Sequence, residues 1–234
     1  MQDTNKYQQF AQAAFGFKFD NPQLLITALT HRSYMNEHKK SATEHNERLE
    51  FLGDAVLELA VTKHLYLNYG EPEGILTNWR AALVRTESIS EAGSKLGLYD
   101  LMRLSRGEKH GSERAKQQIL ANAFEAVIGA IYLDKGYEVA AEFVEKNIVS
   151  KLEGILQEGS WRDAKSRLQE VAQSKFGQTP AYKVLEEVGP DHDKVFTLGV
   201  FVGGKLMGRG SGPSKQTAQQ QAAQTALISL EARK

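Results

Sequence analysis

Apolar side chains between residues 1 and 158 recur every three to four positions, the spacing typical of amphipathic helices. We expect helices over residues 10–17, 22–29, 48–67, 81–93, 119–133 and 139–156. Turns are predicted at residues 69–72, 106–111 and 135–136, where glycine, proline and polar residues gather. Strand-like alternation of apolar and polar residues does not occur in this part, so the pattern predicts a mainly α N-terminal domain.

The pattern changes near residues 154–160, where glycine and serine indicate a linker. A helix is expected over residues 163–176, then strands over 181–188, 195–202 and 205–210, then a helix over 215–232 with Ser214 as its N-cap. Gly203 and Gly204 fit a hairpin turn, and the glycines at 208–212 are also interpreted as a turn. The sequence therefore predicts a helical domain over 1–156, a linker over 157–161 and a small α+β (α-β-β-β-α) domain over 162–232.

Composition narrows the class of protein. The chain has 234 residues, of which 41% are hydrophobic and 25% charged, as in ordinary globular proteins. The absence of cysteine excludes disulfides, thiolate catalysis and zinc–cysteine sites. No apolar run reaches about 18 residues and the start lacks the pattern of a signal peptide, so we expect a soluble, cytoplasmic protein. The net charge is zero, but residues 160–234 hold 11 basic and 7 acidic side chains, which favours an anionic partner there.

Acidic side chains interrupt two of the most apolar predicted helices. Glu47, Glu50 and Asp54 are spaced to share one helix face, and Asn122 and Glu125 share a face of the second helix. The residues around them are mostly apolar, which predicts buried helices, and a buried unpaired carboxylate shifts its pKa or recruits a cation. If the two helices pack together, Glu50, Asp54, Asn122 and Glu125 form an all-oxygen set that suits Mg²⁺ or Mn²⁺.

Plainer interpretations of these residues remain open. Glu47 and Glu50 could pair with Arg48 on a solvated face, while Asn122 could be a core amide and Glu125 the partner of an arginine. A glycine inside a helix, as at Gly53, costs about 1 kcal/mol relative to alanine, which indicates close packing at that position. The histidines show no HExxH spacing, and neither a GxSxG nor a GxxxxGK[ST] motif is present.

Polar residues of the C-terminal domain fall into three zones. The first helix contributes Gln169 and Glu170, the loop after the first strand contributes His192, and the start of the last helix contributes Ser214, Lys215, Gln216 and Gln219. The N–H groups of a helix N-terminus and a nearby lysine can hold phosphates. Three such zones suit recognition of duplex RNA by its shape, phosphates and 2′-hydroxyls, whereas one zone alone would fit a capped surface helix equally well.

Two segments resemble those of a known family. HNERLEFLGDAVLEL at residues 45–59 resembles the signature motif of bacterial ribonuclease III, and LANAFEAVIGAIYLD at 120–134 resembles its second acidic helix. Residues 28–34 and 74–84 support the resemblance, and the last domain is similar to a double-stranded RNA-binding domain. The resemblance implies a homodimeric, Mg²⁺-dependent helical endonuclease that cuts both strands of duplex RNA. It also implies 5′-phosphate and 3′-hydroxyl ends, a short 3′ overhang, and ribosomal RNA precursors and other RNAs as targets.

The resemblance also implies roles for particular residues. Glu50, Asp54 and Glu125 take the metal and catalytic positions, and Glu47 acts near the scissile phosphate. The family usually has Asp at the position of Asn122, so we predict weaker metal affinity here, with a higher Mg²⁺ requirement or a preference for Mn²⁺. The family often has two lysines where this chain has Lys215 and Gln216, which predicts weaker RNA binding with a shallower salt dependence.

Two other functions are compatible with parts of the sequence. Asn122 would suit a non-catalytic binder of duplex RNA, although the intact Glu50, Asp54 and Glu125 argue against it. A phosphohydrolase for small nucleotides would need histidine ligands in a closed pocket, and the histidines of this sequence show no paired spacing that would supply them.

Overall fold

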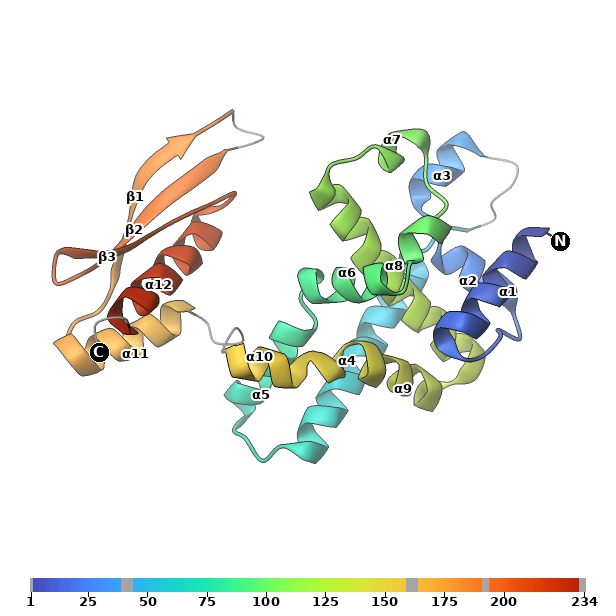
Figure 1. Cartoon of the computed structure of the whole chain (residues 1–234), viewed down its shortest axis with the longest axis horizontal. Coiled ribbons are helices and arrows are strands. Elements are labelled where there is room, and N and C mark those ends of the chain that lie inside the picture. The colour runs from blue at the N-terminus through green and yellow to red at the C-terminus, as the bar shows by residue number, and fades with distance from the viewer. Residues whose placement is uncertain (1, 39–43, 159–163, 191–193, 232–234) are drawn as a thin grey trace. The chain divides into compact units, whose positions relative to one another are not determined.

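The computed structural model describes residues 2–38, 44–158, 164–190 and 194–231 (Figure 1). The chain divides into two compact units, residues 1–161 and 162–234. The first unit is built of helices and the second has the order α-β-β-β-α, so the predicted fold class is confirmed. No helix in the described residues combines the length and the apolar character that crossing a bilayer would require.

The first unit follows the predicted helical pattern over most of its length. Its elements are α1 (Gln2–Phe15), α2 (Pro22–Ala28), α3 (Arg32–Glu37), α4 (Glu47–Asn68), α5 (Glu73–Leu83), α6 (Thr86–Lys95), η1 (Leu98–Leu101), α7 (Arg106–Lys109), α8 (Glu113–Lys135), α9 (Tyr137–Asn147), η2 (Val149–Lys151) and α10 (Leu152–Glu158).

Three predictions about these helices were wrong. The helix expected over 81–93 is divided between α5 and α6, because the backbone of Arg85 is extended with ψ 149°. The helix expected over 139–156 is broken after α9 by the 3₁₀ turn η2. The turn expected over 106–111 contains the short helix α7, which Ser105 caps by accepting a hydrogen bond from the Glu108 N–H. Neither glycine nor proline marks the first two breaks, so periodicity alone does not detect them.

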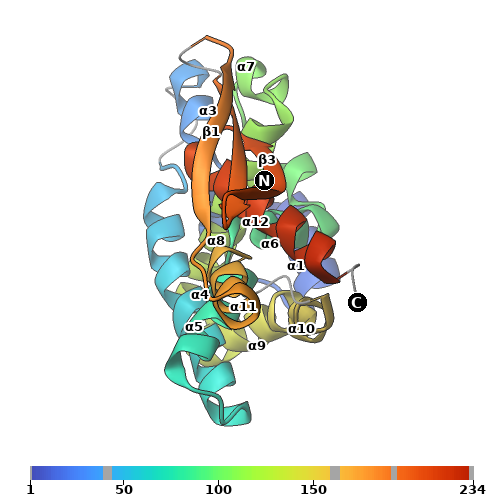
Figure 2. The same cartoon turned by 90° about the vertical axis from the view of Figure 1, so that its left-hand side faces the viewer.

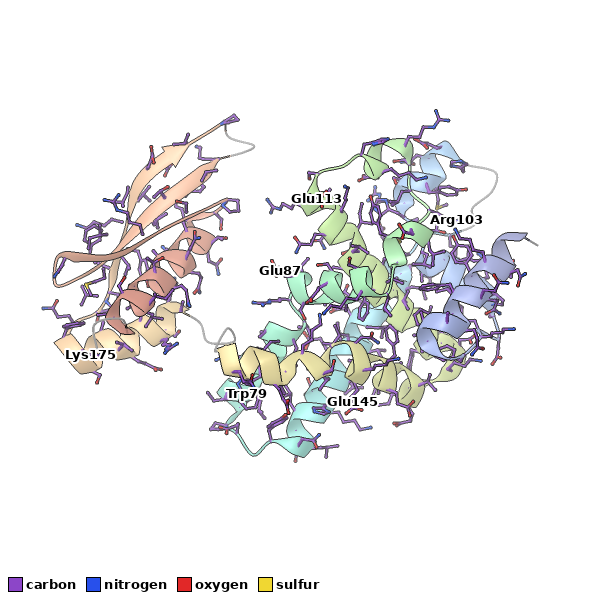
Figure 3. All side chains as sticks on the ribbon, viewed as in Figure 1. Trp79, Glu87, Arg103, Glu113, Glu145 and Lys175 are labelled. Atoms are coloured by element: carbon purple, nitrogen blue, oxygen red, sulfur yellow. The ribbon has the colours of Figure 1, made fainter. Side chains whose placement is uncertain are left out.

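Helix α8 lies at the centre of the first unit, where it contacts α2, α4, α6 and α9. Its apolar side chains form much of the core, and Phe124, Ile128 and Ile131 are fully buried. Helix α9 also contacts α4 through Glu145, labelled in Figure 3, whose Oε1 lies 2.8 Å from His64 Nδ1 of α4. The helix that carries Asn122 and Glu125 is therefore held from several sides.

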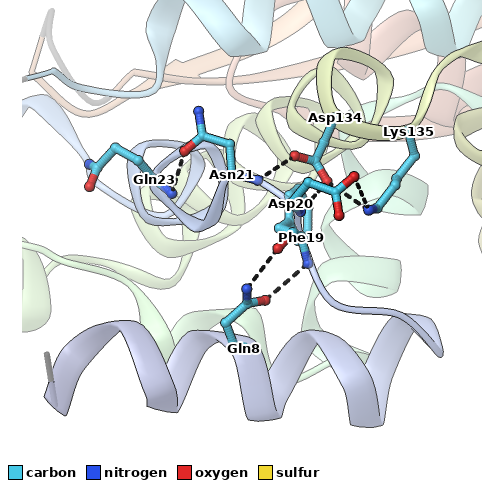
Figure 4. Close-up of polar contacts among 7 residues, drawn as sticks. All are labelled: Gln8, Phe19, Asp20, Asn21, Gln23, Asp134 and Lys135. Atoms are coloured by element: carbon cyan, nitrogen blue, oxygen red, sulfur yellow. Dashed lines mark hydrogen bonds and ion pairs between the residues drawn. The ribbon is translucent and has the colours of Figure 1, made fainter.

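A polar cluster fixes the C-terminal end of α8 to the turn before α2 (Figure 4). The Asp134 carboxylate, almost fully buried, accepts hydrogen bonds from the backbone N–H groups of Asp20 and Asn21 at 2.9 and 2.8 Å. The Lys135 ammonium lies 2.8 Å from the Asp20 carboxylate. The Gln8 amide pairs with both backbone groups of Phe19, so three segments distant in sequence are joined by directional bonds.

Helix α4 is buried on one face only, contrary to the expectation of a buried helix. Its core face includes Leu57, Val61 and Leu65. On another face Phe51, Ala55, Leu59 and Tyr66 are exposed to solvent, and Phe51 is 82% exposed. We call these four residues the α4 strip. They follow one another at helical spacing and leave a line of apolar surface along the first unit.

The second unit consists of α11 (Ala164–Phe176), β1 (Ala181–Val188), β2 (Val195–Val202), β3 (Lys205–Gly212) and α12 (Lys215–Glu231). The strands form an antiparallel sheet in the order β1-β2-β3. Helix α12 packs on β2 and β3, and α11 lies against α12 (Figures 1 and 2). The packing face of α12 is buried; it comprises Ala218, Ala222, Ala223, Ala226 and Leu227.

Strand β3 is two residues longer than predicted, because Ser211 and Gly212 pair with Thr197 and Phe196 of β2. The interpretation of the glycines at 208–212 as a turn was wrong, since these residues belong to the strand. A Cβ at Gly208 would lie 2.6 Å from the Ala226 nitrogen, and one at Gly210 would overlap the backbone of α12. Glycine at these positions lets the helix approach the sheet closely.

Candidate active site

Two glycines bring the backbones of α4 and α8 into contact. A Cβ at Gly53 would overlap the Glu125 carbonyl oxygen and lie 2.9 Å from the Gly129 nitrogen. A Cβ at Gly129 would overlap the Leu49 carbonyl oxygen and lie 3.2 Å from the Gly53 nitrogen. The close packing predicted at Gly53 is thus confirmed. The two predicted acidic helices cross at the positions where they carry their carboxylates.

Three carboxyl groups interact at this crossing. Glu50 and Asp54 flank Gly53 on α4, while Glu125 lies one turn before Gly129 on α8. Burial raises the pKa of Glu125 to about 8, and repulsion from Asp54 and then Glu50 adds to the effect. Burial likewise raises the pKa of Glu50, with further contributions from Glu47 and Asp54. The crossing concentrates negative charge that a bound cation would neutralise.

The carboxyl groups at the crossing are neighbours, but they do not form a complete metal-binding site. Across the described parts of the chain, no three His, Asp or Glu side chains are arranged to hold a metal ion by themselves. The oxygen-only chemistry of Glu50, Asp54, Asn122 and Glu125 fits a hard divalent cation such as Mg²⁺. Their assignment as metal ligands stays a prediction, as does the catalytic role of Asp54, Glu125 and Glu47.

Asn122 is half-buried on α8 beside Glu50. Its Oδ1 accepts a hydrogen bond of 2.7 Å from Gln118 Nε2, one turn earlier on the same helix. The Asn122 amide beside Glu50 lowers the pKa of that carboxyl, against the larger effect of burial, which raises it. The sequence predictions did not include Gln118, although its spacing of four residues from Asn122 was visible.

Glu47 lies at the edge of the crossing, at the first residue of α4. Its carboxylate is 3.3 Å from Arg32 Nη1 on α3 and 3.8 Å from His45 Nδ1. The pairing with Arg48 considered from the sequence is replaced by this pairing with Arg32. Because both side chains of the Arg32–Glu47 pair are about half exposed or more, the pair orients Glu47 more than it stabilises the fold.

The predicted RNA-binding residues of the second unit lie on α11 and at the start of α12. Gln169 and Glu170 are exposed on α11, and Ser214, Lys215 and Gln216 are exposed at the start of α12. The Ser214 hydroxyl accepts a hydrogen bond from the Thr217 N–H at 3.1 Å, so the predicted N-cap is confirmed.

Two of these residues already have polar partners within the unit. Lys215 Nζ lies 3.3 Å from Glu187 Oε1 on β1, and Gln219 accepts a hydrogen bond from Lys165 Nζ at 2.8 Å. His192 lies outside the described residues. The RNA-binding role of all these residues stays a prediction.

Comparison with known proteins gives matches for both units. The ribonuclease-III-like family model matches residues 21–152, and the double-stranded RNA binding motif matches residues 164–230. The chain is 46% identical to Ribonuclease 3 of Desulforamulus reducens over 92% of this chain and 88% of the relative. It is 43% identical to Ribonuclease 3 of Protochlamydia amoebophila over 94% and 90% of the two chains.

A solved structure gives the same assignment for the first unit. The nuclease domain of ribonuclease III from Campylobacter jejuni aligns with a TM-score of 0.53 and 41% identity, covering 60% of this chain and 96% of that domain. Family models and full-length relatives together account for both the carboxylate-bearing helices and the α-β-β-β-α unit. The chain therefore belongs to the ribonuclease III family.

Proposed function

We propose that this protein is an endoribonuclease that hydrolyses phosphodiester bonds in double-stranded RNA and leaves 5′-phosphate and 3′-hydroxyl ends. The observation that carries the proposal is the α4–α8 crossing, where Glu50, Asp54 and Glu125 influence one another's charge. Its natural targets would be ribosomal RNA precursors and other RNAs in the cytoplasm. Residues 1–156 would form the endonuclease domain, 157–161 the linker and 162–232 the RNA-binding domain.

Some of the site residues would hold a cation, and others would orient the RNA strand. Glu50, Asp54 and Glu125, with Asn122 beside them, would hold Mg²⁺, for which Mn²⁺ could substitute. A divalent cation there supplies Lewis-acid stabilisation of the charge that develops on the phosphate and the leaving oxygen. Glu125 must lose its proton to take part, and Glu47, oriented by Arg32, would border the path of the scissile strand.

The second unit would bind the duplex by shape. Gln169 and Glu170 on α11 and the residues Ser214, Lys215, Gln216 and Gln219 on α12 are side chains that can reach 2′-hydroxyls and phosphates. The N–H groups at the start of α12 add a site suited to a phosphate. His192 would serve the third contact zone.

We further propose that the protein acts as a homodimer, because a duplex presents two strands and each site cuts one. The α4 strip supports this proposal, since apolar surface of this kind is rarely left uncovered. Next to Phe51 lies a cavity of about 730 Å³ whose lining includes Leu24, Leu52 and Leu133. The Campylobacter jejuni nuclease domain is itself described as having a region involved in dimer formation.

The experiment that tests the activity uses a perfect RNA duplex, the full-length protein and a series of Mg²⁺ and Mn²⁺ concentrations. We expect metal-dependent cutting to short duplexes. In Glu125→Ala the rate should fall by about a thousandfold, because cation stabilisation of the transition state contributes several kcal/mol. The matched control is Glu113→Ala, which removes an exposed carboxylate of α8 that pairs only locally with Lys116 and should leave the rate unchanged.

Competing substrates separate the alternatives. Single-stranded RNA, duplex DNA and free nucleotides should remain intact under the same conditions. Tight duplex binding without cutting under any metal would instead identify a non-catalytic binder. Hydrolysis of free nucleotides would identify a small-molecule phosphohydrolase.

A further inference from the structure

The sheet of the second unit carries an apolar cluster on the face turned away from α12. Val200 of β2 packs against that helix, so its neighbour Gly199 faces the other way, because successive residues of a strand point to opposite faces. A Cβ at Gly199 would lie 2.8 Å from Leu206, 3.0 Å from Leu185 and 3.1 Å from Phe201. Because Gly199 has no side chain, one apolar residue from each strand closes over this position.

The apolar cluster is open to solvent. Leu185 is 43% exposed, Leu206 is 36% exposed, and Phe201 is partly exposed. In an antiparallel sheet with one face packed against a helix, the other face usually carries polar side chains. Apolar side chains gathered on the outer face therefore indicate a surface that contacts a partner.

Two basic residues flank the apolar cluster. Lys183 of β1 and Arg209 of β3 are both paired with Gly199 of β2, so the three residues form a row across the sheet and share its outer face. Lys183 Nζ lies 5.4 Å from the centre of the Phe201 ring. Arg209 is exposed and forms no ion pair or hydrogen bond with the residues that the structure describes. We call Lys183, Leu185, Phe201, Leu206 and Arg209 the sheet patch.

The chemistry of the sheet patch favours a ligand that is both anionic and apolar. Duplex RNA displays phosphates and 2′-hydroxyls and stacks its bases inside, so it offers little apolar surface to these side chains. A single strand exposes the faces of its bases beside its phosphates, and aromatic side chains in a basic setting bind such strands. Because the stem of a lysine is flexible, Lys183 can leave the face of the Phe201 ring to a base and pair with the adjoining phosphate.

We propose that the sheet patch binds single-stranded RNA, with a base stacked on Phe201 and phosphates held by Lys183 and Arg209. This face is separate from the residues of α11 and α12 proposed to contact the duplex, so the inference goes beyond the proposed function. It would let the protein prefer duplexes that continue into a single-stranded tail or loop.

The identity of the second unit favours RNA over an acidic peptide as the occupant. This unit matches the double-stranded RNA binding motif. A single strand that is covalently joined to a bound duplex has a high effective concentration at a neighbouring site, whereas a peptide would have to arrive as a separate molecule.

The experiment measures the binding of a fluorescent oligouridylate of about 12 nucleotides, a length within the range of known single-strand sites. Fluorescence anisotropy with the full-length protein and a chelator records affinity without cleavage. In Phe201→Leu we expect the dissociation constant to rise about fivefold or more, because the stacking of one base is lost. Phe201→Tyr keeps an aromatic ring and should bind like the natural chain.

Arg209→Gln and Lys183→Gln test the phosphate contacts. Each substitution should weaken binding and reduce the slope of log affinity against log salt concentration by about 0.7, the value for one phosphate of a single strand. The matched control is Lys175→Gln, which removes an exposed charge of α11 outside the sheet patch. This control should leave the affinity and the salt slope unchanged.

A blunt RNA duplex and the same duplex with an oligouridylate tail show whether the sheet patch is separate from the duplex site. Phe201→Leu and Arg209→Gln should bind the blunt duplex as the natural chain does. They should lose only the additional affinity that the tail provides. Melting temperatures close to that of the natural chain would show that the second unit stays folded.

Several outcomes would overturn the proposal. The natural chain could fail to bind oligouridylate, or Phe201→Leu and Arg209→Gln could bind it as tightly as the natural chain. Equal losses for oligouridylate and for the blunt duplex would mean that these side chains do not form a separate single-strand site. Binding of a peptide of alternating glutamate and phenylalanine, without binding of oligouridylate, would assign the sheet patch to a protein partner. In each case normal cutting of duplex RNA would leave the proposed function intact.

Discussion

At the scale of single residues, the burial of Glu125 links protonation to stability. Its pKa of about 8, against 4.5 for a free glutamate, means that the metal-free folded protein binds this proton between those pH values and the unfolded chain does not. The free energy of unfolding therefore decreases as the pH rises from 4.5 to 8, because over this range the unfolded chain has released the proton and the folded protein still holds it. Urea unfolding in the presence of a chelator, at pH 5 and pH 8, measures this loss.

The variant Glu125→Gln provides the comparison, because its side chain stays neutral at both pH values. We expect it to gain stability relative to the natural chain as the pH rises from 5 to 8. Added Mg²⁺ at pH 8 should stabilise the natural chain more than the variant, because the amide that replaces the ionised carboxylate brings no negative charge to the cation. A difference in stability that stayed constant between the two pH values would show that Glu125 titrates normally.

Residue types and spacing made the acidic positions predictable, because carboxylates are conspicuous inside apolar helices. The same reasoning did not reveal how each side chain is held. Arg32 lies 15 positions before Glu47, and Glu187 lies 28 positions before Lys215, so nothing local in the sequence links the members of either pair. Gln118 was visible at helical spacing, but a glutamine on an exposed face has many possible partners.

At the scale of helices, the crossing of α4 and α8 depends on the absence of a side chain at Gly53. In Gly53→Ala the new Cβ would lie 2.6 Å from the carbonyl carbon of Glu125 and overlap its oxygen, so the helices would have to separate. We expect a loss of about 3 kcal/mol in the free energy of unfolding, at the upper end of overpacking effects. Gly74→Ala on α5, where nothing lies within 4 Å, should be neutral or slightly stabilising.

Thermal or urea unfolding of the two glycine variants, compared with the natural chain, checks the Gly53 prediction. Because the carboxylates meet where the backbones touch, Gly53→Ala should also lower the pKa of Glu125 as the crossing opens to water. Equal stability of Gly53→Ala and Gly74→Ala would mean that α4 and α8 pack less tightly than the structure indicates.

Long helices and their contacts were predictable from periodicity, whereas their interruptions were not. At the α5–α6 break at Arg85 and at the turn η2 the sequence has neither glycine nor proline, so no local residue signals the interruption. The glycines of β3 were misinterpreted for a related reason. Gly208 and Gly210 look like turn residues in the sequence, and only the approach of α12 explains their place in a strand.

At the scale of the whole molecule, the α4 strip predicts self-association. Phe51 is 82% exposed in the single chain, so it contributes little to the fold of that chain and is free to contact a second copy. We expect Phe51→Asp to convert a dimer into a monomer, because two charges would have to be buried in a symmetric interface. Analytical ultracentrifugation over a range of protein concentrations measures the change, and circular dichroism should show an intact fold.

The matched control for Phe51→Asp is Ile228→Asp on α12, which replaces another exposed apolar residue. This variant should remain dimeric.

Dimerisation also has a consequence for strand cleavage. A mixed dimer of one natural chain and one Glu125→Ala chain should nick a single strand, since each site would serve one strand of the duplex. If the natural chain sedimented as a monomer at every concentration and still cut both strands, a second copy would not be needed for cutting. The α4 strip would then have to bind a different partner.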